Sequence, residues 1–291
     1  MPSDRSELTW TRMAQEWSDP GPGHAMDEGI TIQLRKGLEL TVNHHPGVAP
    51  PLVFLHGGLG NRLNWRSQFT FAVSQDWEAL AYDLAGHGSS SPYQRYSIGR
   101  HCRDLTRLLD RFGVKAPVLC CHSYGVPIGL EWAQRHPTRG LILIAGGTHD
   151  LDPWWEIPLM TAMAWGGRHL FRFDAMQRWA QALMGTHRSP VVEQFLAESP
   201  IPTDEHSYRA LNIFWGYDFF ARSDATSLRR IPILVISGGR DPCFSGSMGE
   251  QLASHFDRAE HLHLPEASHL LMAEDPAAVN GAMARWIRTL V

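Results

Sequence analysis

Short runs of consecutive apolar residues alternate with longer stretches of helical periodicity along most of this 291-residue chain. The apolar runs have the length and composition of strands buried on both faces, and lie at residues 52–55, 77–82, 118–121, 141–145 and 233–236. Helical periodicity is found at residues 98–112, 124–136, 246–256 and 276–290. This alternation predicts an α/β fold, with a mostly parallel sheet covered by helices on both faces.

Two parts of the chain depart from this alternation. Residues 30–34 and 38–42 alternate apolar and polar positions around the turn Arg35-Lys36-Gly37, which predicts an antiparallel hairpin. The second part, residues 146–230, has helical periodicity, little strand character and many Trp, Phe and Met residues. A segment this apolar is expected to fold as a helical cap over an apolar pocket, although its side chains could equally form only the core of the cap. The candidate pocket residues are Trp154, Trp155 and Trp215.

These patterns predict three parts. Residues 1–27 form an N-terminal extension, residues 28–147 and 230–291 form the α/β core, and residues 148–229 form the cap inserted after the sixth strand. The extension contains a short amphipathic piece followed by a Pro/Gly loop, and its role is not indicated by the sequence.

The charge and composition of the chain limit the kinds of partner and cofactor that we expect it to bind. The net charge is −4, and no Lys/Arg-rich run is present, so a nucleic-acid partner is not expected. There is neither a signal-peptide pattern nor a run approaching the roughly 18 apolar residues of a membrane span, which predicts a cytoplasmic protein without such a span. The four cysteines lack CxxC spacing, and no HExxH or other ligand pattern indicates a metal. The oligomeric state cannot be predicted.

A candidate nucleophile follows the run at 118–121. The pentapeptide Cys121-His122-Ser123-Tyr124-Gly125 lies between a predicted strand and a predicted helix, the context in which a sharp turn exposes a nucleophilic serine. Small residues are needed two positions before and after the serine, and Cys121 stands where glycine is usual. Because a thiol side chain is larger than hydrogen, we expect the turn to open slightly.

An acid and a base follow in order. Asp241 lies on a Gly-rich turn shortly after the run at 233–236, and His269 follows a short predicted strand and a loop. A serine hydroxyl needs such a base within hydrogen-bond reach and an acid that orients the base. Asp150 and Asp152, after the sixth strand, are the alternative acids.

Other titratable residues near these motifs are expected to be structural. His56 and His87 are expected to hydrogen-bond the backbone, Asp83 to fix its own loop, and His122 and His263 to be packed side chains.

Five motifs in this order resemble those of the α/β-hydrolase superfamily. They are Leu55-His56-Gly57-Gly58, the loop from Asp83 to Ser90, the serine pentapeptide, and the Asp241 and His269 segments. The likeness spans residue 29 to the C-terminus and is greatest to the capped abhydrolase-domain esterases and lipases. It implies the α/β-hydrolase fold, with an eight-stranded sheet and a helical cap after strand 6.

The resemblance also implies roles. Ser123 would attack an acyl carbonyl, His269 would accept and return the proton, and Asp241 would hold His269 in the useful tautomer. The N–H groups of Tyr124 and Gly58, with Leu59 next in line, would form the oxyanion hole.

The expected function is hydrolysis of a small carboxylic ester with an apolar acyl or aryl group, through an acyl-enzyme and without a cofactor. The same triad also serves thioesterases, lactonases and C–C bond hydrolases, so these remain alternatives. A non-hydrolytic enzyme or a binding protein of the same fold is the other class that stays open.

Overall fold

The computed structural model describes residues 29–48, 50–146, 219–222 and 225–290 continuously, with isolated positions Met26, Phe173, Ala175, Glu193, Ala197, His206 and Ala210. The predicted extension (1–27) and cap (148–229) therefore lie largely outside the described residues. So do the pocket candidates Trp154, Trp155 and Trp215. The division into extension, core and cap stays a prediction.

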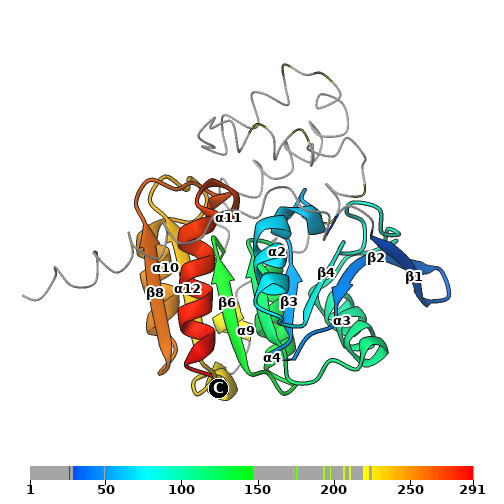
Figure 1. Cartoon of the computed structure of the whole chain (residues 1–291), viewed down its shortest axis with the longest axis horizontal. Helices are drawn as coiled ribbons and strands as arrows, with labels where there is room; N and C mark the ends of the chain where they lie inside the picture. The colour runs from blue at the N-terminus through cyan, green and yellow to red at the C-terminus, as the bar shows by residue number, and fades with distance from the viewer. Residues whose placement is uncertain are drawn as a thin grey trace, which may run out of the picture.

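An eight-stranded sheet runs through the core in the order β1-β2-β4-β3-β5-β6-β7-β8 (Figure 1). Strand β2 is antiparallel to β1 and β4, and every other neighbouring pair is parallel. The predicted mostly parallel eight-stranded sheet is confirmed, with the hairpin at one edge. The strands are β1 (Ile30–Arg35), β2 (Leu38–His45), β3 (Leu52–Leu55), β4 (Ala79–Tyr82), β5 (Val118–His122), β6 (Gly140–Ile144), β7 (Ile233–Gly238) and β8 (Ala259–Leu264).

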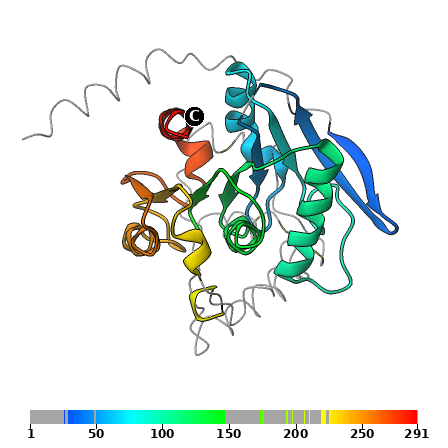
Figure 2. The same ribbon diagram turned by 90° about the horizontal axis from the view of Figure 1, so that it is seen from below.

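Helices cover both faces of this sheet. Helices α2, α11 and α12 lie on one face, and α3, α4 and α10 lie on the other (Figure 2). No helix in the described ranges is long and apolar enough to cross a membrane. The helices are η1 (Arg62–Trp65), α2 (Arg66–Ser74), α3 (Ile98–Phe112), α4 (Gly125–Ala133), α9 (Phe219–Arg222), η3 (Ala225–Leu228), α10 (Gly246–Ser254), α11 (Leu271–Glu274) and α12 (Pro276–Arg288).

The central strands are buried on both faces, as their continuous apolar runs predicted. Every residue of β3, β5, β6 and β7 is buried. Side chains alternate along a strand, so Leu119 and Cys121 of β5 pack in the core on the α3/α4 side, whereas Val118 and Cys120 pack on the α2/α12 side. Burying an aliphatic side chain of this size contributes about 1.5–3 kcal/mol, so the sheet is a rigid support for whatever its ends carry.

The ends of four parallel strands bring the candidate residues together. Strand β5 lies between β3 and β6, and β7 lies between β6 and β8. The segments that follow β3, β5, β7 and β8 carry Gly58, Ser123, Asp241 and His269 respectively. Because parallel strands have their carboxyl ends at the same edge, segments far apart in sequence meet there.

Candidate active site

Ser123 occupies a sharp turn between β5 and α4. Its φ of 46° lies in the left-handed region, which is unfavourable by roughly 1–2 kcal/mol for a residue with a side chain. Two main-chain hydrogen bonds hold the turn: Ser123 N–H donates to the Ile144 carbonyl at 2.9 Å, and the Ser123 carbonyl accepts from Val126 N–H at 2.9 Å. Glycine is required beyond it, because a Cβ at Gly125 would lie 2.6 Å from the Leu55 carbonyl oxygen.

Cys121 takes the place of the first glycine of the usual motif, and helix α4 accommodates its side chain. A Cβ on Gly129, inside α4, would lie 2.4 Å from the Cys121 sulfur. The thiol therefore occupies the space that a side chain at 129 would need. The small residue that this turn requires is therefore supplied by helix α4 at Gly129, and the missing side chain there leaves room for the thiol of Cys121.

His269 links Ser123 to Asp241 by two hydrogen bonds. Its Nδ1 lies 2.9 Å from Asp241 Oδ2, and its Nε2 lies 3.0 Å from Ser123 Oγ. A carboxylate can only accept, so Nδ1 carries the proton and Nε2 of the neutral ring presents its lone pair to the serine hydroxyl. This is the tautomer that a general base requires. The three residues named from the sequence thus lie together in a continuous chain of hydrogen bonds.

Asp241 is buried and held by main-chain donors. Its Oδ1 accepts hydrogen bonds from the N–H groups of Cys243 at 2.8 Å and Phe244 at 3.0 Å, which leaves Oδ2 for His269. Arg240 N–H donates to the Ala267 carbonyl at 2.9 Å and thereby ties the loop after β7 to the loop that carries His269. The carboxylate is therefore fixed in place before any substrate arrives.

The His122 side chain holds the loop that carries His269 through a hydrogen bond to the main chain of that loop. Its Nε2 lies 2.9 Å from the His269 carbonyl oxygen and must donate to it, so Nδ1 is unprotonated. Burial, and then the nearby His269, lower the pKa of His122 well below its usual value, which keeps the ring neutral. Among the described residues Nδ1 has no hydrogen-bond partner, and a Cβ at Gly57 would lie 2.5 Å from it. The sequence indicated a packed side chain but not its contact with the histidine loop.

The loop after β3 turns sharply at Gly58 and Leu59. Gly60 N–H donates to the Gly57 carbonyl at 3.2 Å, which places Gly58 and Leu59 at the corner of the turn, and Leu59 has a φ of 59°. N–H groups at the corner of such a turn take no part in its hydrogen bond. They are thus available in a loop that passes close to the serine, since a Cβ built at Gly57 would lie 3.3 Å from Ser123 Cβ.

His56 fixes this loop. Its Nε2 accepts from Leu84 N–H at 2.9 Å, so Nδ1 donates to the Gly57 carbonyl at 2.7 Å. Burial lowers the pKa of His56 to about 4, consistent with the neutral ring that this pair of hydrogen bonds needs. The expected backbone contacts of His56 are therefore present, and they join the β3 loop to the β4 loop.

Tyr124 follows the serine, and its side chain reaches toward helix α3. The hydroxyl donates to the Ala210 carbonyl at 3.3 Å and lies 2.9 Å from His101 Nε2, which donates to it. Burial lowers the pKa of His101 to about 3, so this histidine is neutral. Sequence reasoning missed His101, since nothing in its helical context marks it as a partner of the serine turn.

The remaining candidates have structural contacts. Asp83 accepts from Arg62 N–H at 2.7 Å and from Ser89 N–H at 2.9 Å, within and beside its own loop. His87 Nδ1 lies 3.3 Å from the Ala85 carbonyl, and His263 Nδ1 lies 3.1 Å from Ser237 Oγ. The alternative acids, Asp150 and Asp152, lie outside the described residues.

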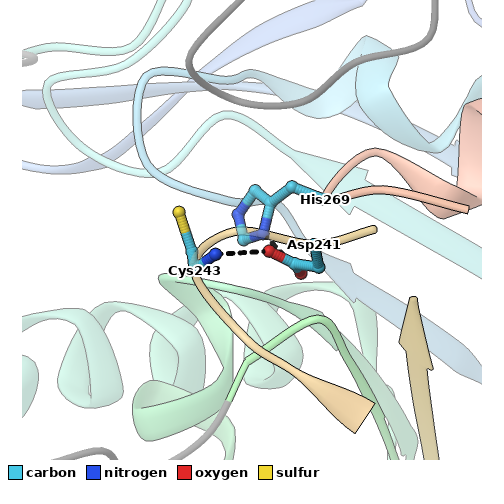
Figure 3. Close-up of side chains that lie close together, drawn as sticks. All are labelled: Asp241, Cys243 and His269. Carbon is cyan, nitrogen blue, oxygen red and sulfur yellow. Dashed lines mark hydrogen bonds and ion pairs between the residues drawn. The ribbon is translucent and has the colours of Figure 1, made fainter. Parts of the chain in front are cut away.

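One group in the described part of the chain offers three metal-ligand atoms close together. A carboxylate oxygen of Asp241, the thiol of Cys243 and a ring nitrogen of His269 all lie within 4.8 Å of one another (Figure 3). In Figure 3 the main-chain nitrogen of Cys243 and the imidazole both contact the Asp241 carboxylate. Burial and the Asp241 charge raise the pKa of the Cys243 thiol to about 11, so it is protonated near neutral pH. The hydrogen bonds that Asp241 makes with His269 and with the Cys243 N–H bring these three residues together.

Comparison with known proteins assigns the family. A family model described as the alpha/beta hydrolase fold matches residues 50–276, about three quarters of the chain. The chain belongs to the α/β-hydrolase fold family. That match runs from the start of β3 to the start of α12, so it includes every segment that contributes to the serine, histidine and aspartate arrangement.

Sequence comparison finds relatives of this α/β-hydrolase chain whose names indicate different roles. Protein ABHD8 of Bos taurus is 26% identical over 237 residues, which cover 79% of this chain and 54% of that protein. The chain thus spans about half the length of the first of its curated relatives. The 3-oxoadipate enol-lactonase 2 of Acinetobacter baylyi is 29% identical over 245 residues, covering 80% of this chain and 87% of that enzyme.

Solved structures share the fold. The enol-lactonase from Burkholderia xenovorans has a TM-score of 0.76 at 24% identity, with 87% of this chain and 97% of that chain covered. A thermophilic esterase from Thermogutta terrifontis also has a TM-score of 0.76, at 20% identity, with 90% and 99% covered. At these identities the likeness establishes the fold.

Proposed function

We propose that this chain is a serine hydrolase that cleaves a carboxylic ester with an apolar acyl or aryl group through an acyl-enzyme intermediate. The observation that carries the proposal is the hydrogen-bonded line from Asp241 through His269 to Ser123, with the serine held at a positive φ. Strained backbone at a nucleophile is typical of a site built for chemistry, because the surrounding sheet must stabilise it.

The first step is attack of Ser123 Oγ on the ester carbonyl carbon. His269 Nε2 takes the hydroxyl proton as the C–O bond forms, and the resulting imidazolium is stabilised by Asp241 through Nδ1–H. Two main-chain N–H groups hold Oδ1 of Asp241 in place, and its Oδ2 accepts the hydrogen bond from the imidazolium.

The carbonyl oxygen becomes an oxyanion in the tetrahedral intermediate. The N–H groups of Tyr124 and of Gly58, with Leu59 beside it, are the proposed donors; each such donor is worth roughly 3 kcal/mol in the transition state. Tyr124 also precedes the first turn of α4, whose dipole favours negative charge at that end. The intermediate collapses as His269 returns its proton to the leaving alkoxide, and water then hydrolyses the acyl-serine by the same route.

A cyclic ester is the second candidate substrate. A relative with enol-lactonase in its name matches 80% of this chain, and a lactone is an ester whose leaving group stays attached to the acyl chain. The same residues would open it, so lactone and open-chain ester differ in the pocket and not in the triad. The aromatic residues of the predicted cap, including Trp154, Trp155 and Trp215, support an apolar acyl group.

The test compares hydrolysis of p-nitrophenyl esters of increasing acyl length by the wild type and by Ser123→Ala, with opening of 3-oxoadipate enol-lactone measured beside them. A fluorophosphonate probe reports the reactivity of the serine itself. Ser237→Ala is the matched control, because Ser237 is buried on β7 and its hydroxyl lies within hydrogen-bond distance of His261 and His263.

We expect Ser123→Ala to lower kcat by roughly 10⁶-fold and to abolish labelling, whereas Ser237→Ala keeps both. The acyl length with the greatest kcat/KM then indicates how long an acyl chain the substrate pocket accommodates. A folded wild type that neither turns over any of these substrates nor reacts with the probe would overturn the proposal. Labelling without turnover would instead indicate a thioester or a C–C bond as the substrate.

A further inference from the structure

A second candidate site lies away from the serine, where helix α3 meets the β1–β2 hairpin at the edge of the sheet (Figure 1). A pocket of about 330 Å³ opens there, and its lining consists of Arg35, Arg100, Arg103, Asp104 and Arg107. Three of the arginines come from α3 and Arg35 comes from the end of β1. Every lining residue is charged.

The charges in this pocket do not balance. Four guanidinium groups face one carboxylate, an excess of three positive charges in a chain whose net charge is −4. Asp104 is buried and is shared by two of the arginines, with Arg107 Nη1 at 3.0 Å and Arg35 Nε at 3.5 Å, and it also accepts from the Tyr93 hydroxyl. Three of the roughly four lone-pair sites of this carboxylate are thus already in use.

The other two arginines have no carboxylate partner in the described part of the chain. The guanidinium of Arg100 lies 5.8 Å from the centre of the Tyr93 ring, so an aromatic face orients it while its N–H groups stay available. Arg103 is exposed one turn further along α3. These two side chains supply donors that no described protein group satisfies.

The position of Arg100 on the helix adds to the imbalance. Ser97 caps the N-terminus of α3, and Arg100 lies in the first turn, which contains no acidic residue. The positive end of a helix dipole favours anions, so a cation placed there is destabilising. Both the repulsion among the arginines and the unfavourable dipole would be relieved by the same event, the arrival of an anion.

We propose that this pocket binds a multiply charged anion of the phosphate type. A guanidinium presents a planar fork of N–H donors that matches two phosphate oxygens, and two arginines oriented by Asp104 with one oriented by Tyr93 form a partly preorganised set. The volume suits a small group such as a diphosphate or a phosphorylated headgroup. The site shares no residue with the proposed triad, and the proposal does not depend on the proposed function.

The test measures binding of pyrophosphate to the full chain by calorimetry, and the shift in melting temperature that it causes, at constant ionic strength set with chloride. Arg100→Gln, Arg103→Gln and the double variant are compared with the wild type. Arg229→Gln/Arg230→Gln is the matched control: these two arginines are exposed, lie elsewhere on the chain, and give the same change of net charge.

We expect pyrophosphate to raise the melting temperature of the wild type, and each α3 substitution to weaken binding by at least about tenfold, the factor that corresponds to one charge-assisted contact of about 1.4 kcal/mol. The control pair should bind as the wild type does. Without the anion the double variant should melt at or above the wild-type temperature, because a repulsion has been removed.

Vesicles distinguish the two sources of such a phosphate group. The wild type and the α3 variants are mixed with phosphatidylcholine vesicles that contain phosphatidic acid. If the wild type binds these vesicles, the variants do not, and pyrophosphate alone binds only weakly, the ligand is a lipid headgroup. Binding of pyrophosphate in solution would identify a free phosphorylated molecule. Absence of both kinds of binding, equal loss in the control pair, or a double variant that is markedly less stable in chloride alone would overturn the proposal.

Discussion

The pairing of Cys121 with Gly129 makes a quantitative prediction about the serine turn. A methyl group at position 129 would lie 2.4 Å from the Cys121 sulfur, whereas non-bonded atoms prefer about 3.5–4.0 Å. Overpacking of this kind in a buried site costs about 1–3 kcal/mol, and replacing a mid-helix glycine by alanine returns about 1 kcal/mol of helix propensity. Gly129→Ala should therefore reduce the free energy of unfolding, by up to about 2 kcal/mol.

Removing the sulfur should reverse the sign. In a Cys121→Ala background, the nearest atom of residue 121 is its Cβ, which lies 3.6 Å from the added methyl group, an ordinary contact. The same Gly129→Ala change should then stabilise the chain by about 1 kcal/mol. The two substitutions should be coupled by roughly 1–3 kcal/mol in a double-mutant cycle measured by urea denaturation.

Gly281→Ala in α12 supplies the control. No atom lies within 4 Å of a Cβ built at Gly281, so alanine should stabilise the helix there by about 1 kcal/mol whichever residue occupies position 121. If Gly129→Ala stabilised the wild type as Gly281→Ala does, the argument that α4 makes room for Cys121 would be refuted.

Two further predictions concern the histidines and their acid. Asp241→Asn should lower kcat for ester hydrolysis by roughly 10⁴-fold with unchanged circular dichroism, because an amide cannot stabilise the imidazolium of His269; a loss below tenfold would remove Asp241 from the triad. The pKa of His56 is about 4 when folded and about 6.5 when unfolded, so the unfolded state takes up the proton first as the pH falls. Between pH 7 and pH 5 this should remove about 2 kcal/mol of stability, and His56→Gln should flatten that decline in urea titrations.

Much of the core follows from the sequence because its signals are local. The run at 52–55 became β3 with the same bounds, and the periodic segment at 98–112 became α3, since Leu105, Leu108 and Leu109 lie on one helical stripe. Helix α2 was missed; in the structure its Phe69 and Ala72, about one turn apart, pack in the core on the α2/α12 side of the sheet.

The sequence was enough to name the candidate site residues, but not the contacts that hold them in place. Ser123, Asp241 and His269 each follow a recognisable strand, and the motifs around them with their chain order named all three, with Asp150 and Asp152 kept as alternative acids. The contact of His122 with the His269 carbonyl and the space that Gly129 leaves for Cys121 could not be predicted, since each joins residues on different elements. No local pattern encodes such pairs, because the final packing of the sheet determines them.

The hydrogen bond between Ser123 and His269 joins residues 146 positions apart. At a synthesis rate of about 5–20 residues per second, a growing chain carries the serine for roughly 7–30 seconds before its base has been made. During that time the proposed nucleophile has neither its proposed base nor its proposed acid beside it. Because Asp241 and His269 follow β7 and β8, the proposed triad is complete only when these two late strands have joined the sheet.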